Sequence, residues 1–93
     1  MYRPLPSNVT IKKSDIEGLG LWSLETIKEG TEIGMSHFYW GTELHRTPLG
    51  AFYNHSEEPN IHKVRRDSRY FICALRDILP GEELTCNYTL YSL

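Results

Sequence analysis

Hydrophobic residues occur along the chain in short runs, and glycine, proline or polar pairs interrupt them every few positions. Runs of this length, rich in β-branched and aromatic residues, predict strands joined by tight turns. No window carries the apolar i, i+3, i+4 repeat of a long helix, so only single helical turns are expected and the domain is predicted to be mostly β. The predicted strands are residues 9–12, 21–23, 32–38, 49–53, 62–65, 69–74 and 83–88.

A ten-residue pattern occurs twice, at residues 24–33 and 75–84. In each copy a residue that can accept backbone N–H bonds, Thr26 or Asp77, precedes an isoleucine that we expect in the core. Each copy then reaches a glycine, whose access to positive φ lets the next strand begin. We interpret both copies as structural starts of strands and not as catalytic elements.

The chain of 93 residues, with 40% hydrophobic content, predicts one domain spanning residues 1–93. A chain of this size has a modest core, so a partner subunit would stabilise it and a homodimer is expected. Its 12 acidic and 10 basic side chains form no strong block, which argues against direct nucleic-acid binding. The basic segment 63–66 beside Asp67 is interpreted as a solvated strand and turn.

Several classes of protein are not indicated by the sequence. A signal peptide and an apolar stretch of ~20 residues are both missing, so a cytoplasmic location is expected, in a host cell if the source is viral. Cys73 and Cys86 lie in apolar runs and are expected to be free thiols that act as small hydrophobic residues. None of the histidines has a partner at a zinc-site spacing, so no metal site is expected.

The segment Gly18-Leu19-Gly20, followed by Trp22, allows two interpretations. It can form an ordinary hairpin turn. Alternatively, the two glycines remove side chains so that the backbone can approach a ligand with both a carboxylate and an ammonium group. In that case Trp22 lies at the edge of the pocket or packs beneath it.

The polar segment Asn54-His55-Ser56 follows three apolar residues and therefore needs partners for its side chains. One interpretation is a turn whose side chains bond to nearby backbone N–H groups. The other is a binding loop. The acidic pair that follows, Glu57 and Glu58, either attracts a basic substrate or solvates the loop, and solvation is favoured.

These two segments and Gly81-Glu82-Glu83-Leu84-Thr85-Cys86-Asn87-Tyr88 resemble the SET domain in order and in spacing, from about residue 9 to residue 91. The resemblance implies a SET-domain fold of small curved sheets with a C-terminal pseudoknot-like segment. It also implies S-adenosylmethionine as cofactor and a lysine side chain of a basic protein as methyl acceptor. The chain is similar to the compact SET proteins of viruses and bacteria, and protein-lysine methyltransferase activity is the expected function.

The resemblance also implies roles for individual residues. Methyl transfer to an amine depends mainly on positioning, and tyrosine rings and hydroxyls suit the guidance of a neutral lysine amine. Each tyrosine also has a structural alternative, in which the ring packs and the hydroxyl bonds to a carbonyl. The implied cofactor-binding residues are Gly18, Leu19, Gly20, Trp22, Tyr53, Asn54, His55 and Tyr91, and the implied catalytic residues are Tyr88 and Tyr39, the latter in a Tyr-x-Gly element.

The chain departs from the family in three ways, and the first two favour an alternative, a catalytically inactive SET-like binding module for a basic peptide. About a dozen residues separate Gly41 from Asn54, so the insert that forms one wall of the substrate groove is nearly absent. Asn87 occupies a position that is commonly acidic in the family. No cysteine-rich tail follows Tyr88. The missing wall either comes from a second subunit or leaves the groove open.

Overall fold

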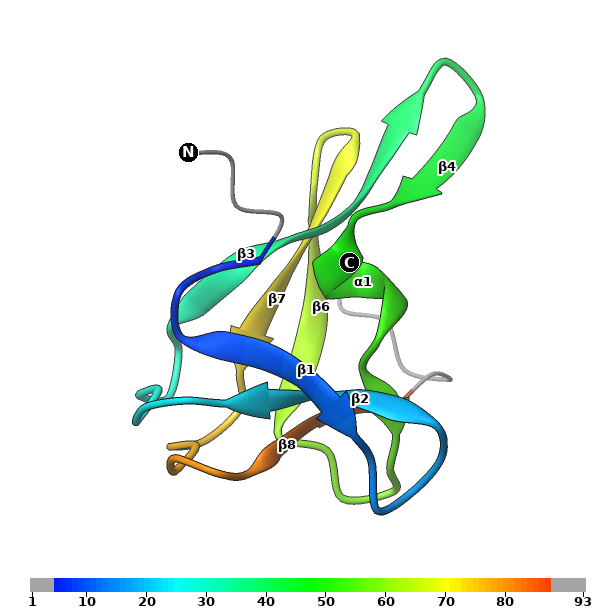
Figure 1. Cartoon of the computed structure of the whole chain (residues 1–93). Helices are drawn as coiled ribbons and strands as arrows, with labels where there is room; N and C mark the ends of the chain where they lie inside the picture. The colour runs from blue at the N-terminus through cyan, green and yellow to red at the C-terminus, as the bar shows by residue number, and fades with distance from the viewer. Residues whose placement is uncertain (1–4, 88–93) are drawn as a thin grey trace.

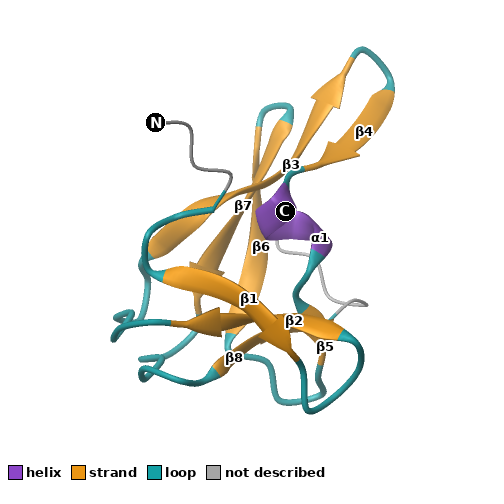
Figure 2. Cartoon of the chain, in the orientation of Figure 1, coloured by secondary structure: helices purple, strands orange, loops and turns teal. Residues whose placement is uncertain are grey.

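The computed structural model describes residues 5–87, which form two four-stranded sheets and one short helix (Figures 1 and 2). The first sheet contains, in order, β1 (Val9–Lys13), β2 (Leu19–Ser23), β8 (Glu83–Cys86) and β5 (Asn54–His55). The second contains β4 (Glu43–Arg46), β3 (Glu32–Trp40), β7 (Arg69–Ala74) and β6 (Ile61–Arg66). The prediction of a mostly β fold built from small sheets is therefore confirmed.

Strand β8 lies between two segments that are distant in sequence. It pairs antiparallel with β2 and parallel with β5, so that Asn54 lies opposite Thr85. Asn60 fixes this arrangement, because its Oδ1 accepts the Thr85 N–H at 2.8 Å and its Nδ2 donates to the Glu83 carbonyl at 2.8 Å. The loop carrying Asn54 is thereby held against the last strand of the first sheet.

The two copies of the repeated pattern pair with each other. Ile27 and Ile78 exchange two backbone hydrogen bonds of 2.8 Å, and both side chains are buried. The glycine of each copy has a positive φ, 83° or 84°, as expected for the start of a strand. One detail of the prediction was wrong: Asp77 accepts the N–H of Glu29, in the other copy, and not a bond within its own turn.

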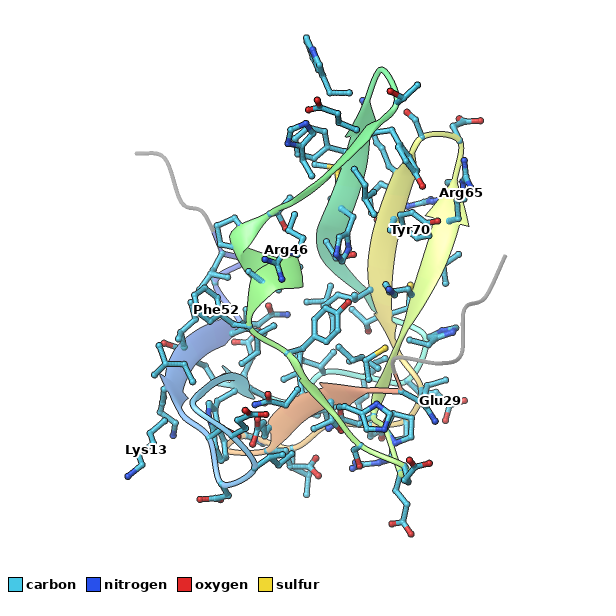
Figure 3. All side chains as sticks on the ribbon, turned by 90° about the vertical axis from the view of Figure 1, so that its right-hand side faces the viewer. Lys13, Glu29, Arg46, Phe52, Arg65 and Tyr70 are labelled. Atoms are coloured by element: carbon cyan, nitrogen blue, oxygen red, sulfur yellow. The ribbon has the colours of Figure 1, made fainter. Side chains whose placement is uncertain are left out.

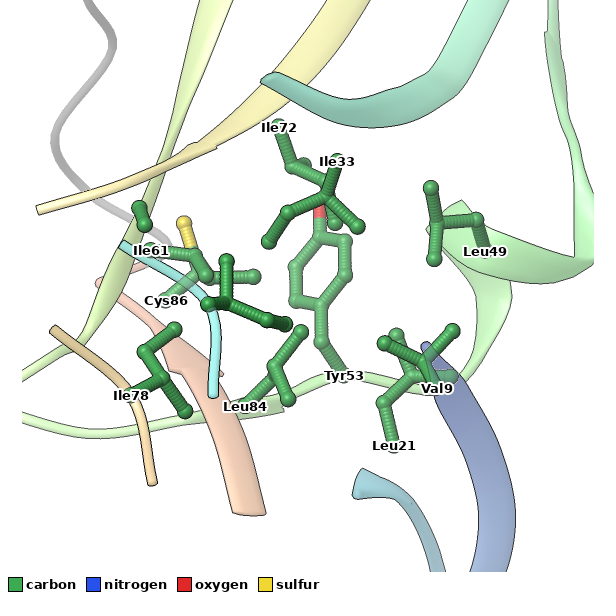
Figure 4. Close-up of a cluster of buried hydrophobic side chains, with 12 residues drawn as sticks. Val9, Leu21, Ile33, Leu49, Tyr53, Ile61, Ile72, Ile78, Leu84 and Cys86 are labelled. Carbon is green, nitrogen blue, oxygen red and sulfur yellow. The ribbon is translucent and has the colours of Figure 1, made fainter. Parts of the chain in front are cut away.

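The hydrophobic core lies between the two sheets and draws residues from both (Figure 4). The ring of Tyr53 occupies the middle of this cluster and is 7% exposed. Its side chain therefore contributes to packing. The twelve buried residues are Val9, Leu21, Ile27, Ile33, Leu49, Tyr53, Ile61, Ile72, Ala74, Ile78, Leu84 and Cys86.

The predicted strand at 49–53 was wrong, because this segment begins with helix α1 (Pro48–Ala51). Thr47 is the N-cap: its hydroxyl accepts the Gly50 N–H at 3.3 Å and donates to the Met35 carbonyl at 2.7 Å. Proline in the first turn reinforces this start, since its fixed φ suits a helix. The capping signal therefore overrides the apolar run that suggested a strand. Strand β4 was missed because all its residues are exposed and give no alternating pattern.

Helix α1 approaches β3 so closely that Gly50 is expected to be intolerant of any side chain. A Cβ at this position would lie 2.1 Å from the carbonyl oxygen of Ser36. In an open helix, glycine to alanine stabilises by about 1 kcal/mol. Here Gly50→Ala is expected to lower the free energy of unfolding by about 1–3 kcal/mol. Urea unfolding measures this, with exposed Ala51→Gly as control. A Gly50→Ala variant at least as stable as the wild type would contradict the close approach.

Candidate functional site

A polar cluster around Asn54 joins three parts of the first sheet. The Asn54 Nδ2 lies near four acceptors: Ser14 Oγ at 3.0 Å, Glu83 Oε2 at 2.9 Å, and the carbonyl oxygens of Glu17 at 3.1 Å and Leu19 at 3.3 Å. The Ser14 hydroxyl in turn lies 2.7 Å from the Glu83 carboxylate and donates to it. The structure therefore brings Asn54 and the glycine loop together, as the sequence predicted, and adds two residues that the sequence analysis missed.

These contacts fix which way round the Asn54 amide lies. Carbonyl and carboxylate oxygens only accept hydrogen bonds, so the NH₂ group must face Glu83 and the loop carbonyls. Within residues 5–87, the Asn54 Oδ1 accepts no hydrogen bond. Asn54 thus presents a hydrogen-bond acceptor beside the glycine loop, and the ligand group that fits it is a donor such as an ammonium.

The two glycines of the loop have different roles. Gly18 has a φ of 51° and its carbonyl accepts the Ser14 N–H at 2.8 Å, so it closes the β1–β2 hairpin as an ordinary turn. Gly20 leaves room for a carboxylate, because a Cβ there would lie 2.3 Å from the Glu83 Oε2. The absence of a side chain at Gly20 therefore lets Glu83 reach Asn54. Backbone approach to a ligand at these glycines stays a prediction.

Trp22 lies on the same face of the first sheet as this cluster, directly opposite Glu83 in the pairing of β2 with β8. The Lys12 ammonium lies 4.7 Å from the centre of its ring. The indole N–H is buried and finds no acceptor in the described part of the chain. Buried N–H groups usually have a partner, so this orphaned donor marks Trp22 as a candidate for a ligand contact.

The remaining residues of the Asn54 loop bond mainly among themselves. The His55 imidazole lies 3.2 Å from the Glu57 carboxylate, and the Ser56 hydroxyl accepts the Glu58 N–H at 3.1 Å. The backbone of His55 pairs with Cys86. The interpretation as a self-bonded turn therefore holds for Ser56 and does not hold for Asn54. A cofactor contact at His55 stays a prediction.

Tyr39 belongs to a different part of the molecule. It lies near the end of β3, and its ring centre is 6.4 Å from that of Tyr70 on β7. The Arg65 guanidinium lies 5.4 Å from the Tyr39 ring. The contacts of Tyr39 are thus with the second sheet, whereas the Asn54 cluster belongs to the first. The other two predicted tyrosines, Tyr88 and Tyr91, lie outside the described residues.

The burial of two polar groups in the second sheet was not predicted from the sequence. His37 is 7% exposed and its Nδ1 lies 2.9 Å from the Ser36 hydroxyl oxygen. Burial, followed by the charges of Lys63 and Arg46, lowers the pKa of His37 from 6.5 to about 4. Lys63 is itself only 9% exposed, so the interpretation of segment 63–66 as solvated was wrong at its first residue. The spacing of Ile61 and Lys63, which places both on one face, was the available signal.

The lowered pKa of His37 predicts a loss of stability in mild acid. Between about pH 6.5 and pH 4 the unfolded chain binds a proton at this residue and the folded chain does not, so stability falls as the pH falls. The full effect is at most about 3 kcal/mol. Denaturant unfolding of the wild type and of His37→Gln across this range measures it, because carboxylate titration is common to both. Equal slopes for the two proteins would contradict the expectation.

Other features limit the type of site. Cys73 and Cys86 are free thiols, in agreement with the sequence. Over the described range 5–87, no group of three or more histidine, cysteine or acidic side chains is arranged to hold a metal ion. The same range contains no helix long and apolar enough to span a membrane. The Asn54 cluster, with its connected polar side chains, is the candidate functional site.

The model of the SET domain family matches residues 34–89, more than half of the chain, and the chain therefore belongs to the SET-domain family. A search of curated proteins found no match.

Solved structures share the fold. A Plasmodium falciparum protein described as a candidate histone methyltransferase is 27% identical, with a TM-score of 0.70, over 88% of this chain and 97% of that chain. The methyltransferase domain of human PR domain-containing protein 2 is 19% identical, with a TM-score of 0.71, over 88% of this chain and 77% of that chain. A Chaetomium thermophilum Polycomb Repressive Complex 2 structure, a humanized mutant, is 24% identical, with a TM-score of 0.72, over 89% of this chain and 15% of that chain. The last two show the fold alone, while the family and the first neighbour support a methyltransferase function.

Proposed function

We propose that the protein is an S-adenosylmethionine-dependent protein-lysine methyltransferase. The observation that carries the proposal is the orientation of the Asn54 amide. Its Nδ2 is used by Glu83, Ser14 and loop carbonyls, which leaves Oδ1 as an acceptor beside the glycine loop. An acceptor oriented in this way suits the ammonium of the methionine part of the cofactor.

The residues of the first sheet fit the cofactor in chemical type. Asn54 would accept from its ammonium, and the indole N–H of Trp22 is a buried donor without a partner among residues 5–87. Leu19, half exposed beside the cluster, offers apolar surface. When bound, the cofactor supplies a sulfonium-activated methyl group, and transfer breaks the sulfur–carbon bond and forms a bond to the lysine nitrogen.

The acceptor lysine belongs to the substrate, and the site must hold its amine in the neutral form. A free lysine has a pKa of about 10.4, so the site has to favour loss of the proton by desolvation or by nearby positive charge. Tyr39 and Tyr88 are proposed to guide the lysine stem and to orient the nitrogen. A basic protein as acceptor, cofactor contacts at Tyr53 and Tyr91, and a homodimer stay predictions.

The alternative is a SET-like module that binds a peptide without methylating it. The β3–β4 hairpin leads directly into α1, so the short connection between Gly41 and Asn54 builds no additional wall (Figure 1). Asn87 also stands where an acidic residue is common in the family. These two features favour the module, whereas the organised Asn54 cluster favours the enzyme.

Incubation with methyl-labelled S-adenosylmethionine and a mixture of acidic and basic proteins separates the two functions. Wild-type protein is expected to label a lysine side chain. Tyr88→Phe is expected to bind the cofactor normally and to transfer about 10- to 1,000-fold more slowly, because it lacks the orienting hydroxyl. Cofactor binding by the wild type without label on any acceptor would favour the binding module.

A further inference from the structure

A row of aromatic and basic side chains crosses the second sheet and has no part in the cofactor proposal. The strand register places Arg46 opposite His37, His37 opposite Tyr70, and Tyr70 opposite Arg65, so these four residues share one face. Lys63 and Tyr39 lie two positions from members of the row and extend the same face. We call these six residues the Tyr70 face.

The rings and cations of the Tyr70 face are in contact. The Arg65 guanidinium lies 5.4 Å from the Tyr39 ring centre and 5.7 Å from that of Tyr70. The Lys63 ammonium lies 5.8 Å from the Tyr70 ring centre, and the His37 ring meets Tyr70 edge-on at 6.1 Å. Figure 3 shows Tyr70 beside Arg65, with Arg46 next to α1. Such stacking holds guanidinium groups in place while leaving their N–H groups available.

The charged side chains of this face are all cations: Arg46, Lys63 and Arg65. Lys63 and Arg46 both help to lower the pKa of His37, which keeps the imidazole neutral and leaves the cations as the charged groups. Neither Arg46 nor Arg65 takes part in an ion pair with another residue of the range 5–87. The whole chain carries a net charge of −2, so this face has the opposite sign to the rest of the molecule.

Nearby carboxylates do not cancel this charge. Glu43 pairs with His45 at 3.5 Å, and both alternate with Leu44 and Arg46 to the opposite side of β4. Asp67 lies in the β6–β7 turn, where its backbone carbonyl accepts the Arg65 Nε–H at 3.0 Å. Neither of these contacts places a carboxylate on Arg46 or Arg65.

The Tyr70 face is also linked to the first sheet. Burial raises the pKa of the Cys86 thiol, and the nearby charge of Lys63 acts in the opposite direction. Cys86 is the last residue of β8, in the strand that carries Glu83. Strand β6, which carries Lys63, also packs against β8, so the Tyr70 face lies next to the strand that carries Glu83.

We propose that the Tyr70 face binds a protein segment in which the target lysine is flanked by acidic residues. The inference rests on the proposed function, and it replaces a basic segment with an acidic one at this face. Carboxylates of the segment pair with Arg46 and Arg65, while the apolar stem of the lysine lies against the tyrosine rings. The surrounding positive charge also disfavours the ammonium form of the acceptor, which is the form that must lose its proton.

A nucleic acid is the other ligand with negative charge and stacking groups. The net negative charge of the chain disfavours binding of a long phosphate backbone. The proposed methyl acceptor is a lysine side chain, which a nucleic acid does not contain. An acidic protein segment is therefore the ligand that the charges favour.

The test compares three peptides of equal length with a central lysine and flanks of glutamate, glutamine or lysine. Binding is measured by fluorescence anisotropy with an uncharged dye, so the result does not depend on methyl transfer. The glutamate peptide is expected to bind about 10-fold more tightly than the lysine peptide, with a difference that shrinks as salt is added. Arg65→Glu and Arg46→Glu are expected to abolish or reverse this preference, and both positions are exposed, so folding is preserved. Arg76→Glu, which lies outside the face, serves as control.

The outcomes separate this inference from the proposed function. Equal or tighter binding of the lysine peptide, or tighter binding of a single-stranded oligonucleotide, would overturn the acidic-segment inference. Preference for the glutamate peptide without methyl transfer would leave the inference standing and count against the enzyme. Methyl transfer to the lysine-flanked peptide and not to the glutamate-flanked peptide would support the enzyme and count against the acidic-segment inference.

Discussion

Asn54→Ala is expected to weaken binding of S-adenosylmethionine by about 10- to 100-fold, the usual cost of a lost hydrogen bond to a charged group. The variant loses the Oδ1 acceptor and also the Nδ2 contacts that hold the Glu17 and Leu19 carbonyls. Isothermal titration calorimetry measures the affinity, and circular dichroism checks that the fold is retained.

Asn54→Asp separates the two roles of this side chain. An aspartate would keep an acceptor for the ammonium but would place an oxygen against the Glu83 carboxylate and the loop carbonyls. If the amide orientation matters, the Asn54→Asp variant binds the cofactor no better than the alanine variant. Wild-type affinity in Asn54→Ala would show that Asn54 does not contact the cofactor, and wild-type affinity in Asn54→Asp would show that the Nδ2 contacts are not needed for binding.

Glu83→Ala is expected to produce the second large effect, although the carboxylate is proposed to act through Asn54. Without it, the Asn54 NH₂ loses its charged partner at 2.9 Å, and only Ser14 and the Glu17 and Leu19 carbonyls remain to orient the amide. Cofactor affinity is expected to fall about 10-fold. Glu83→Gln, which keeps one acceptor oxygen, is expected to recover part of the loss. The neighbouring Glu82→Ala is the matched control, because Glu82 bonds to Arg76 and to the Leu79 N–H.

A positioning role for Glu83 differs from a merely structural one in its selectivity. If Glu83 orients the amide, its removal reduces the preference for the cofactor over an analogue that lacks the α-amino group. If Glu83 were merely structural, its removal would weaken the binding of both ligands by the same factor. An unchanged ratio of the two affinities in Glu83→Ala would therefore count against positioning.

Much of the scaffold could be predicted because its signals are local. Short apolar runs between turn residues predicted most strands, and the repeated pattern around Ile27 and Ile78 predicted two starts of strands. The pairing of these two copies with each other depends on contacts between residues distant in sequence, which no local pattern records. Helix α1 was misjudged because the capping by Thr47 depends partly on the Met35 carbonyl, another distant group.

The site was also predicted only in part, because some of its residues give a local signal and others are brought in by contacts distant in sequence. Asn54 stood out because a polar residue follows an apolar run, and the glycine loop stood out by its composition. Glu83 looks like any glutamate in a strand, and only the parallel pairing of β5 with β8 places it beside Asn54. Lys63 was interpreted as solvated because it belongs to a short run of basic residues beside Asp67, yet the register of β6 turns it toward the interior.

The most direct test of the central claim is a titration of the wild-type protein with S-adenosylmethionine and with the analogue that lacks the α-amino group. Because the Asn54 Oδ1 is the acceptor left beside the glycine loop, the natural cofactor is expected to bind at least about 10-fold more tightly than the analogue. Equal affinities for the two compounds, or no binding of either, would contradict the account.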